Sequence, residues 1–151
     1  MYRLYGFSSQ NTLKILYVLE ELGVNYEFKY VDLMKGENRT EDFRKLNPVG
    51  KVPVLQHNDD TLFESGAICR YVANVAESAL YPENKMQRAK VDQWLDYFSC
   101  HLGRWLSTLY FEKIIKPLAK MGEPDEKSCE EAYKFTAQQF KVVNGWLKDH
   151  Q

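Results

Sequence analysis

Two neighbouring serines, Ser8 and Ser9, precede a predicted helix that begins near Asn11. A hydroxyl at that place either caps the helix or donates a hydrogen bond to a bound ligand, and both uses need the same location. Serine is too weakly acidic to act as a base, but its O–H can stabilise an anion such as a thiolate, helped by the positive end of the helix dipole. A hydrogen bond to a charged group contributes about 1.5–3 kcal/mol, which corresponds to roughly one to two pKa units of a bound thiol.

The dipeptide Val52-Pro53 provides a second candidate site. Pro53 stands at the mouth of a short apolar strand, where a proline lacks the N–H of a sheet ladder and is often cis. The main chain of Val52 is then left unpaired and can bind a peptide-like ligand in antiparallel fashion. The other interpretation is an edge-strand proline without a ligand, and the spacing leaves both open.

Glu64 and Ser65 open another predicted helix. The first N–H groups of a helix have no partner within the helix, so they bind anions such as a ligand carboxylate, and the Ser65 hydroxyl adds a donor. The Glu64 carboxylate would then hold a ligand ammonium group. The alternative is a serine N-cap with an acidic neighbour and no ligand.

Short strands alternate with helices over the first half of the sequence, and they must position these polar residues. The periodicity predicts strands at residues 1–5, 26–31, 52–56 and 61–63. It predicts helices at 11–22, at 40–47 with Thr40 as the N-cap, and at 65–75 with Ser65 as the N-cap. The order is therefore βαβ followed by αββα.

The second half shows only helical patterns. Apolar residues at helical spacing predict a long amphipathic helix over 85–115, which Pro117, Gly122 and Pro124 should end. A further helix should begin near Asp125, with its inward face formed by Tyr133, Ala137, Phe140, Val143 and Leu147. We therefore expect an α/β domain at 1–76, a linker at 77–84 and an all-α domain at 85–151, whose apolar stripes call for further helices or another subunit.

Residues 47–55 (NPVGKVPVL) followed by 64–68 (ESGAI) resemble the glutathione-site signature of the glutathione S-transferase superfamily. Residues 5–11 leading to Lys14 are similar to its first strand, loop and helix, and residues 91–95 loosely resemble its helical domain. Each segment alone is a weak signal of the family, but three segments in this order and at these separations are a specific signal. The resemblance implies a thioredoxin-like domain followed by a helical domain that is incomplete here, because family members usually continue beyond the point where this sequence stops.

The resemblance also implies roles for individual residues. Ser9, five residues before Lys14, matches the catalytic serine of the phi, theta and zeta classes, although Ser8 competes with it; Asn11 matches the asparagine of nu-type enzymes. The residues that match glutathione-binding positions are Val52 and the cis-proline Pro53 for the cysteinyl part, Glu64 and Ser65 for the γ-glutamyl end, and Lys51 and Asn38 for the glycine carboxylate.

The resemblance implies a glutathione transferase that acts in detoxification. Its serine-stabilised glutathione thiolate would conjugate or reduce electrophiles and peroxides. Disulfide-bond reduction is a variant. Thioredoxin and glutaredoxin chemistry would need a cysteine in place of the serine. Trp105, Tyr110 and Phe111 are candidates for an electrophile pocket, although aromatic stripes more often form core. The alternative is a non-catalytic interaction module like the gamma subunit of elongation factor 1B or the stringent starvation protein.

Composition limits the other partners. The chain has 151 residues and a net charge of −1, which gives no basic surface for nucleic acid or an anionic membrane. No apolar run approaches the roughly 20 residues of a membrane span, and the first residues do not look like a signal peptide. Three scattered cysteines show no metal-ligand spacing and fit reduced thiols in the cytoplasm. We also expect glutathione as co-substrate and no metal. The resemblance further implies a homodimer, with Arg70 and Asp92 as candidate contacts.

Overall fold

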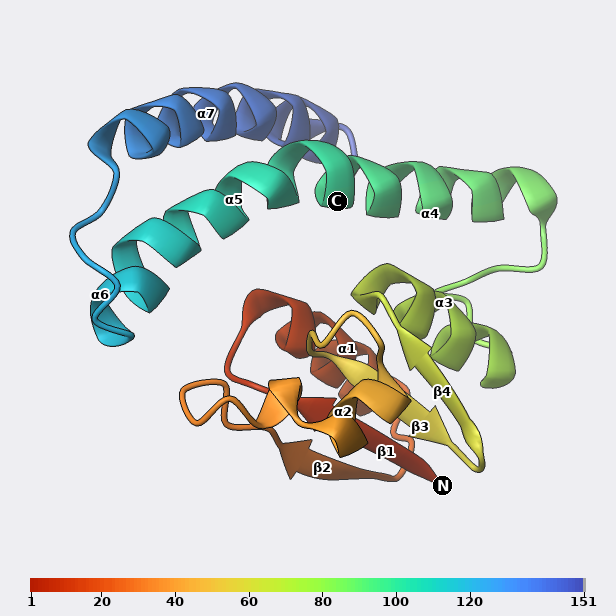
Figure 1. Ribbon diagram of the computed structural model, residues 1–151. Coiled ribbons are helices and arrows are strands. Elements are labelled where there is room, and N and C mark those ends of the chain that lie inside the picture. The colour runs from red at the N-terminus through yellow and green to blue at the C-terminus, as the bar shows by residue number, and fades with distance from the viewer. Residues whose placement is uncertain (151) are drawn as a thin grey trace. The chain divides into compact units, whose positions relative to one another are not determined.

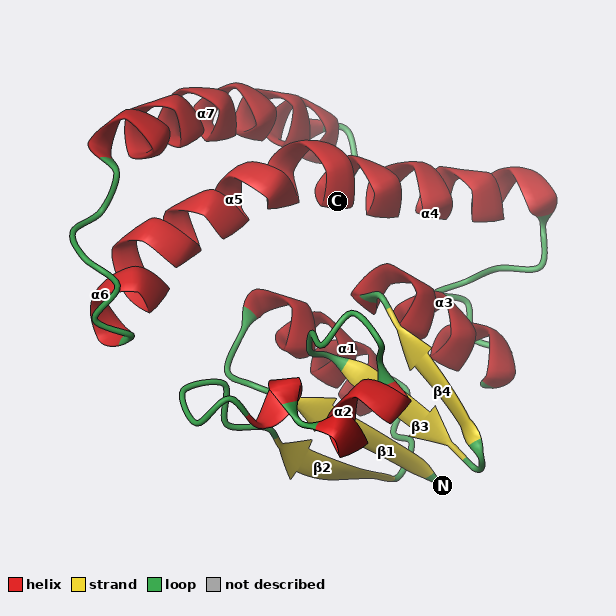
Figure 2. Ribbon diagram, in the orientation of Figure 1, coloured by secondary structure: helices red, strands yellow, loops and turns green. Residues whose placement is uncertain are grey.

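The computed structural model describes residues 1–150, and the chain divides into two compact units, of which the second begins at Lys90. The first unit is built on a four-stranded sheet with the strand order β2-β1-β3-β4 (Figures 1 and 2). Strand β1 runs parallel to β2 and antiparallel to β3, and β3 runs antiparallel to β4. The strands are β1 (Tyr2–Gly6), β2 (Tyr26–Tyr30), β3 (Val54–His57) and β4 (Asp60–Phe63).

Helices cover both faces of this sheet. On one face, α1 (Gln10–Glu21) and α3 (Ser65–Val75) enclose a core of fully buried residues, among them Leu4, Ile15, Leu55, Ile68 and Val72. On the other face lie the short η1 (Glu37–Arg39) and α2 (Glu41–Leu46), and Phe43 of α2 forms a buried cluster with Val31 and Val54. A mixed sheet of this order with helices on both faces is the thioredoxin-like arrangement.

The starts of α1 and α2 follow local side-chain chemistry, whereas the start of α3 does not. Ser9 and Thr40 are the N-caps of α1 and α2, and their hydroxyls accept hydrogen bonds from Thr12 N and Phe43 N. The sequence predicts Ser65 as the N-cap of α3, and this is wrong by one residue: Glu64 holds the cap position and makes no side-chain cap bond. The chain leaves β4 through a left-handed Glu64 (φ 69°), so Ser65 already has helical geometry.

Within the described residues, the second unit contains helices and no strands. A nearly continuous helical path runs through α4 (Lys85–Tyr97), a π-helical turn η2 (Phe98–Leu102), α5 (Gly103–Tyr110), a second π turn η3 (Phe111–Ile115) and α6 (Lys116–Leu118). Pro117 does not end the path at Ile115, because it lies in the first turn of α6, where a missing N–H costs little. None of the helices within residues 1–150 is long and apolar enough to cross a membrane.

The last helix, α7 (Glu126–Lys148), begins near Asp125 as predicted, with Asp125 as its N-cap, but it buries a different face from the predicted one. Cys129, Ala132 and Thr136 are its buried residues. Of the predicted inward residues, Val143 is half-buried, whereas the others are exposed, with Tyr133 at 56% and Leu147 at 48%. Helix α7 packs on α5, where Trp105 stacks on Phe135 with 4.6 Å between ring centroids. The buried residues of α7 are small, and small side chains allow helices to approach closely.

Candidate functional site

The sheet register brings three of the predicted site segments to one edge of the first unit. Tyr5 pairs with Val54, and Val54 pairs with Phe63, so these residues form one row across β1, β3 and β4. Neighbouring strands lie about 4.8 Å apart. The loop after β1, the Val52-Pro53 segment before β3 and the Glu64-Ser65 turn after β4 therefore all leave the sheet at the same end (Figure 1).

Ser9 lies at the N-terminal end of α1, where the helix dipole is positive. Its Oγ accepts a hydrogen bond from Thr12 N at 3.4 Å and lies 3.1 Å from Thr12 Oγ1. Its own N–H donates to the carbonyl oxygen of Phe7 at 2.7 Å, which fixes the loop. Ser9 is half-buried, whereas Ser8 is exposed. Of the two serines, Ser9 alone caps the helix, so an anion at this end of α1 would meet its hydroxyl.

Asn11 and Lys14 form a pair in the first turns of α1. Lys14 Nζ donates to Asn11 Oδ1 at 2.9 Å, and burial lowers the pKa of Lys14. The neighbouring thiol of Cys69, on α3, is buried, and burial raises its pKa to about 11 although Lys14 and Arg70 act to lower it. A thiol with such a pKa stays protonated at neutral pH, which makes Cys69 a poor nucleophile there.

Two asparagine side chains hold the loop that precedes β3. Asn47 is 2% exposed and donates to Lys51 O at 2.7 Å, while Asn38 donates to Gly50 O at 2.7 Å. Gly50 has φ +68°, and a Cβ there would lie 3.2 Å from Asn38 O. The sequence carries one signal for Asn47, an asparagine placed before the turn-forming segment Pro48-Val49-Gly50, but we do not predict this role from it.

The Val52–Pro53 peptide bond is cis, as the resemblance implied. Strand β3 begins only at Val54. Within residues 1–150, the main chain of Val52 makes no hydrogen bond. Its N–H and C=O are thus available for pairing with an extended ligand.

The charged and hydroxyl groups on the rim of this edge are unengaged within the described residues. Lys51 and Glu64 are exposed, Ser65 is half-buried, and their side chains make no hydrogen bond or ion pair there. Glu64 keeps a left-handed backbone that is costly for a residue with a Cβ, and such conformations cluster at binding sites. The rim can therefore offer a cation, a carboxylate and the N–H groups of α3 to a zwitterionic ligand.

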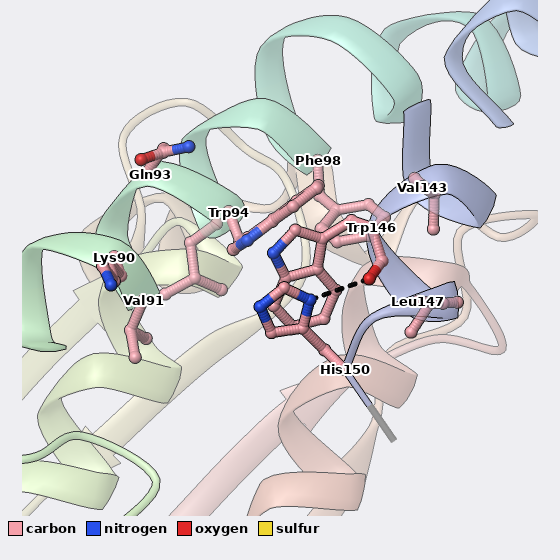
Figure 3. A pocket seen from close by; sticks show the side chains of 10 residues that line it. Lys90, Val91, Gln93, Trp94, Phe98, Val143, Trp146, Leu147 and His150 are labelled. Carbon is pink, nitrogen blue, oxygen red and sulfur yellow. Dashed lines mark hydrogen bonds between the residues drawn. The ribbon is translucent and has the colours of Figure 1, made fainter. Parts of the chain in front are cut away.

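The helical unit contains an apolar cavity of about 700 Å³ between α4 and α7 (Figure 3). Trp94, Phe98 and Trp146 line it, with 5.0 Å between the centroids of the two indoles, and His150 stacks on Trp146. Lys90 lies at its border (Figure 3). Among the described residues, Trp105, Tyr110 and Phe111 do not line this cavity, so the aromatic residues named from the sequence are not those that surround it.

Comparisons with known proteins agree with this arrangement. Residues 1–74 match the family model of the glutathione S-transferase N-terminal domain. A probable glutathione S-transferase of Oryza sativa subsp. japonica is 38% identical over 131 residues, which are 85% of this chain and 61% of the rice protein. This chain thus spans less than two thirds of that relative. Elongation factor 1-gamma 2 of the same species is 37% identical over 106 residues, 67% of this chain but 25% of its own length.

A solved structure extends the likeness to both units. The theta class glutathione S-transferase of Xanthomonas axonopodis pv. citri, crystallised with glutathione bound, has a TM-score of 0.88 and 32% identity. The match covers 97% of this chain and 70% of that chain. This relative is more than 30% identical and matches both units, and the N-terminal domain matches the family model. The chain therefore belongs to the glutathione S-transferase family.

Proposed function

We propose that this protein is a glutathione transferase that binds glutathione at the sheet edge and stabilises its thiolate with Ser9. The observation that carries the proposal is the row Tyr5, Val54 and Phe63, which brings the Ser9 loop, Val52 and Glu64 to one end of the sheet. Family membership supports the same ligand, since relatives named for glutathione transfer match most of the chain.

Each end of glutathione meets a complementary group in this proposal. The unpaired main chain of Val52, next to Pro53, pairs with the cysteinyl residue. The N-terminal N–H groups of α3 and the Ser65 hydroxyl bind the γ-glutamyl carboxylate, and Glu64 binds the ammonium beside it. Lys51 binds the glycine carboxylate. Asn38 holds the Lys51 loop through Gly50 and keeps a second amide N–H for the ligand.

The chemistry then depends on the charge of the sulfur. A free thiol is only a few per cent ionised at pH 7. Ser9 donates its O–H to the thiolate, the amino end of α1 adds a positive potential, and Asn11 offers a further amide donor nearby. The thiol proton goes to solvent. The sulfur then forms a bond to the electrophilic atom, and the leaving group departs with the electron pair of the broken bond.

Calorimetry and thiol titration test this proposal. We expect the wild type to bind glutathione and to conjugate a chlorinated nitrobenzene. Ser9→Ala should keep the binding, raise the pKa of the bound thiol by about one to two units and slow conjugation at neutral pH roughly 10- to 100-fold. Ser8→Ala is the matched control and should behave like the wild type. Absence of binding at millimolar glutathione would refute the proposal.

A second candidate function has its own observation. The rice elongation factor 1-gamma 2 matches two thirds of this chain, so a non-catalytic interaction module is the alternative. That function predicts no glutathione binding and no effect of Ser9→Ala.

For either function we propose a homodimer in the cytoplasm, with Arg70 and Asp92 among its contacts. Light scattering with chromatography would measure the molar mass of the assembly.

A further inference from the structure

The hydroxyl group of Thr12 is within hydrogen-bond distance of the hydroxyl group of Ser9. The two oxygens are 3.1 Å apart, and either can donate. Thr12 is 1% exposed, so its hydroxyl faces the protein interior and the Ser9 loop rather than solvent. Gly6 of β1 makes room for it, because a Cβ on Gly6 would collide with the Thr12 side chain. The packing therefore fixes Thr12 in contact with Ser9.

A count of donors shows why this contact matters. A serine hydroxyl has one proton and two acceptor positions. Thr12 N–H already uses one acceptor position of Ser9 Oγ, at 3.4 Å. If Ser9 donates to Thr12, its proton cannot reach a bound sulfur. If Thr12 donates to Ser9, the Ser9 proton is free to point out of the loop.

We propose that Thr12 is a positioning residue, an inference that rests on the proposed function. Its O–H donates to Ser9 Oγ and so commits the Ser9 proton to the glutathione sulfur. Hydrogen bonds in such a chain polarise each other, so the bond from Ser9 to the thiolate also becomes stronger. Since Thr12 is buried, it touches neither glutathione nor the electrophile and acts only through Ser9.

The test compares Thr12→Val with Thr12→Ser in the full chain. Valine keeps the N–H and nearly the shape of threonine but cannot donate, whereas serine keeps the donor. The readout is the pKa of enzyme-bound glutathione, followed by the ultraviolet absorbance of the thiolate. We expect Thr12→Val to reduce the thiolate fraction at pH 6.5–7 roughly three- to tenfold and to move the pH profile of kcat/KM upward, with little change in glutathione affinity. Thr12→Ser should restore both.

Each result separates this inference from the proposed function. Equal thiol pKa values in the wild type and Thr12→Val, with glutathione bound in both, would overturn the role of Thr12 and leave the role of Ser9 standing. A wild type that binds no glutathione would end the proposed function itself. If Thr12→Val does not fold, Thr12→Ala removes the same donor with a smaller side chain. An unchanged pKa in that variant would overturn the inference equally.

Discussion

Asn47 donates its side-chain N–H to the main-chain carbonyl oxygen of Lys51 over 2.7 Å and accepts a hydrogen bond from Val49 N over 3.0 Å. This buried amide thus closes the turn that leads to Val52. Through these bonds Asn47 sets the path of the chain at Lys51 and Val52. Loop geometry and ligand affinity should therefore depend on it together.

Asn47→Ala removes both hydrogen bonds, leaves two partly buried main-chain groups without their partner and empties the buried position of the amide. We expect the free energy of unfolding to fall by about 1–3 kcal/mol and glutathione to bind more weakly. Urea unfolding and calorimetry measure the two effects. Asn25→Ala, at an exposed loop position, is the control and should change neither. Normal glutathione affinity in a destabilised Asn47→Ala would show that the loop does not need this amide for binding.

Gly103 and Gly145 both lie in helices but in opposite circumstances. A Cβ on Gly103 would collide with Phe98 O in the π turn, whereas a Cβ on Gly145 would meet no atom within 4 Å. Gly103→Ala should therefore destabilise the helical unit by about 1–3 kcal/mol. Gly145→Ala should stabilise it by about 0.5–1 kcal/mol, because alanine is the better helix former. Thermal unfolding compares the pair, and equal effects of the two substitutions would contradict the π-turn packing.

The sequence was most informative where local chemistry decides the structure. Thr40 caps α2 as predicted, and Ser9 takes the capping role that the sequence left open beside ligand binding. Helix α7 begins near Asp125 as predicted, and Asp125 also has a short oxygen side chain suited to an N-cap. The four strands and their order along the chain were also predictable, because strand periodicity is a local signal. The cis-proline before β3 is another local signal. The residues proposed for the ligand were found through the resemblance rather than through these signals.

Features that depend on distant neighbours were not predictable. Two possible apolar stripes run along α7, and only its packing on α5 selects the one with Cys129 and Ala132. The left-handed backbone at Glu64 depends on how β4 turns into α3. The support that Asn47 gives to Lys51, and that Gly6 gives to Thr12, requires the fold itself.

The pKa of Cys69 predicts a loss of stability at alkaline pH. Burial raises it from 9.0 to about 11, so between these values the folded thiol keeps its proton while the unfolded one loses it. The folded state then binds more protons, and stability declines as pH rises through this window, by roughly 2–3 kcal/mol at its upper end. Urea unfolding at pH 8.5 and at pH 10.5 measures the decline. Cys69→Ala should make the decline shallower, and Cys100→Ala, at an exposed position, should leave it in place.

At Glu64, the backbone conformation lowers stability while the side chain is proposed to bind the ligand. Its φ of 69° is unfavourable for a residue with a Cβ, so Glu64→Gly should relieve strain and raise the free energy of unfolding by up to about 1 kcal/mol. The same change removes the carboxylate proposed to hold the glutathione ammonium and should weaken binding about tenfold or more. Asn58→Gly is the matched control, since Asn58 also has a positive φ (57°) but lies in the β3–β4 turn. It should not reduce affinity. Undiminished glutathione binding by Glu64→Gly would show that the strained residue serves the backbone path alone.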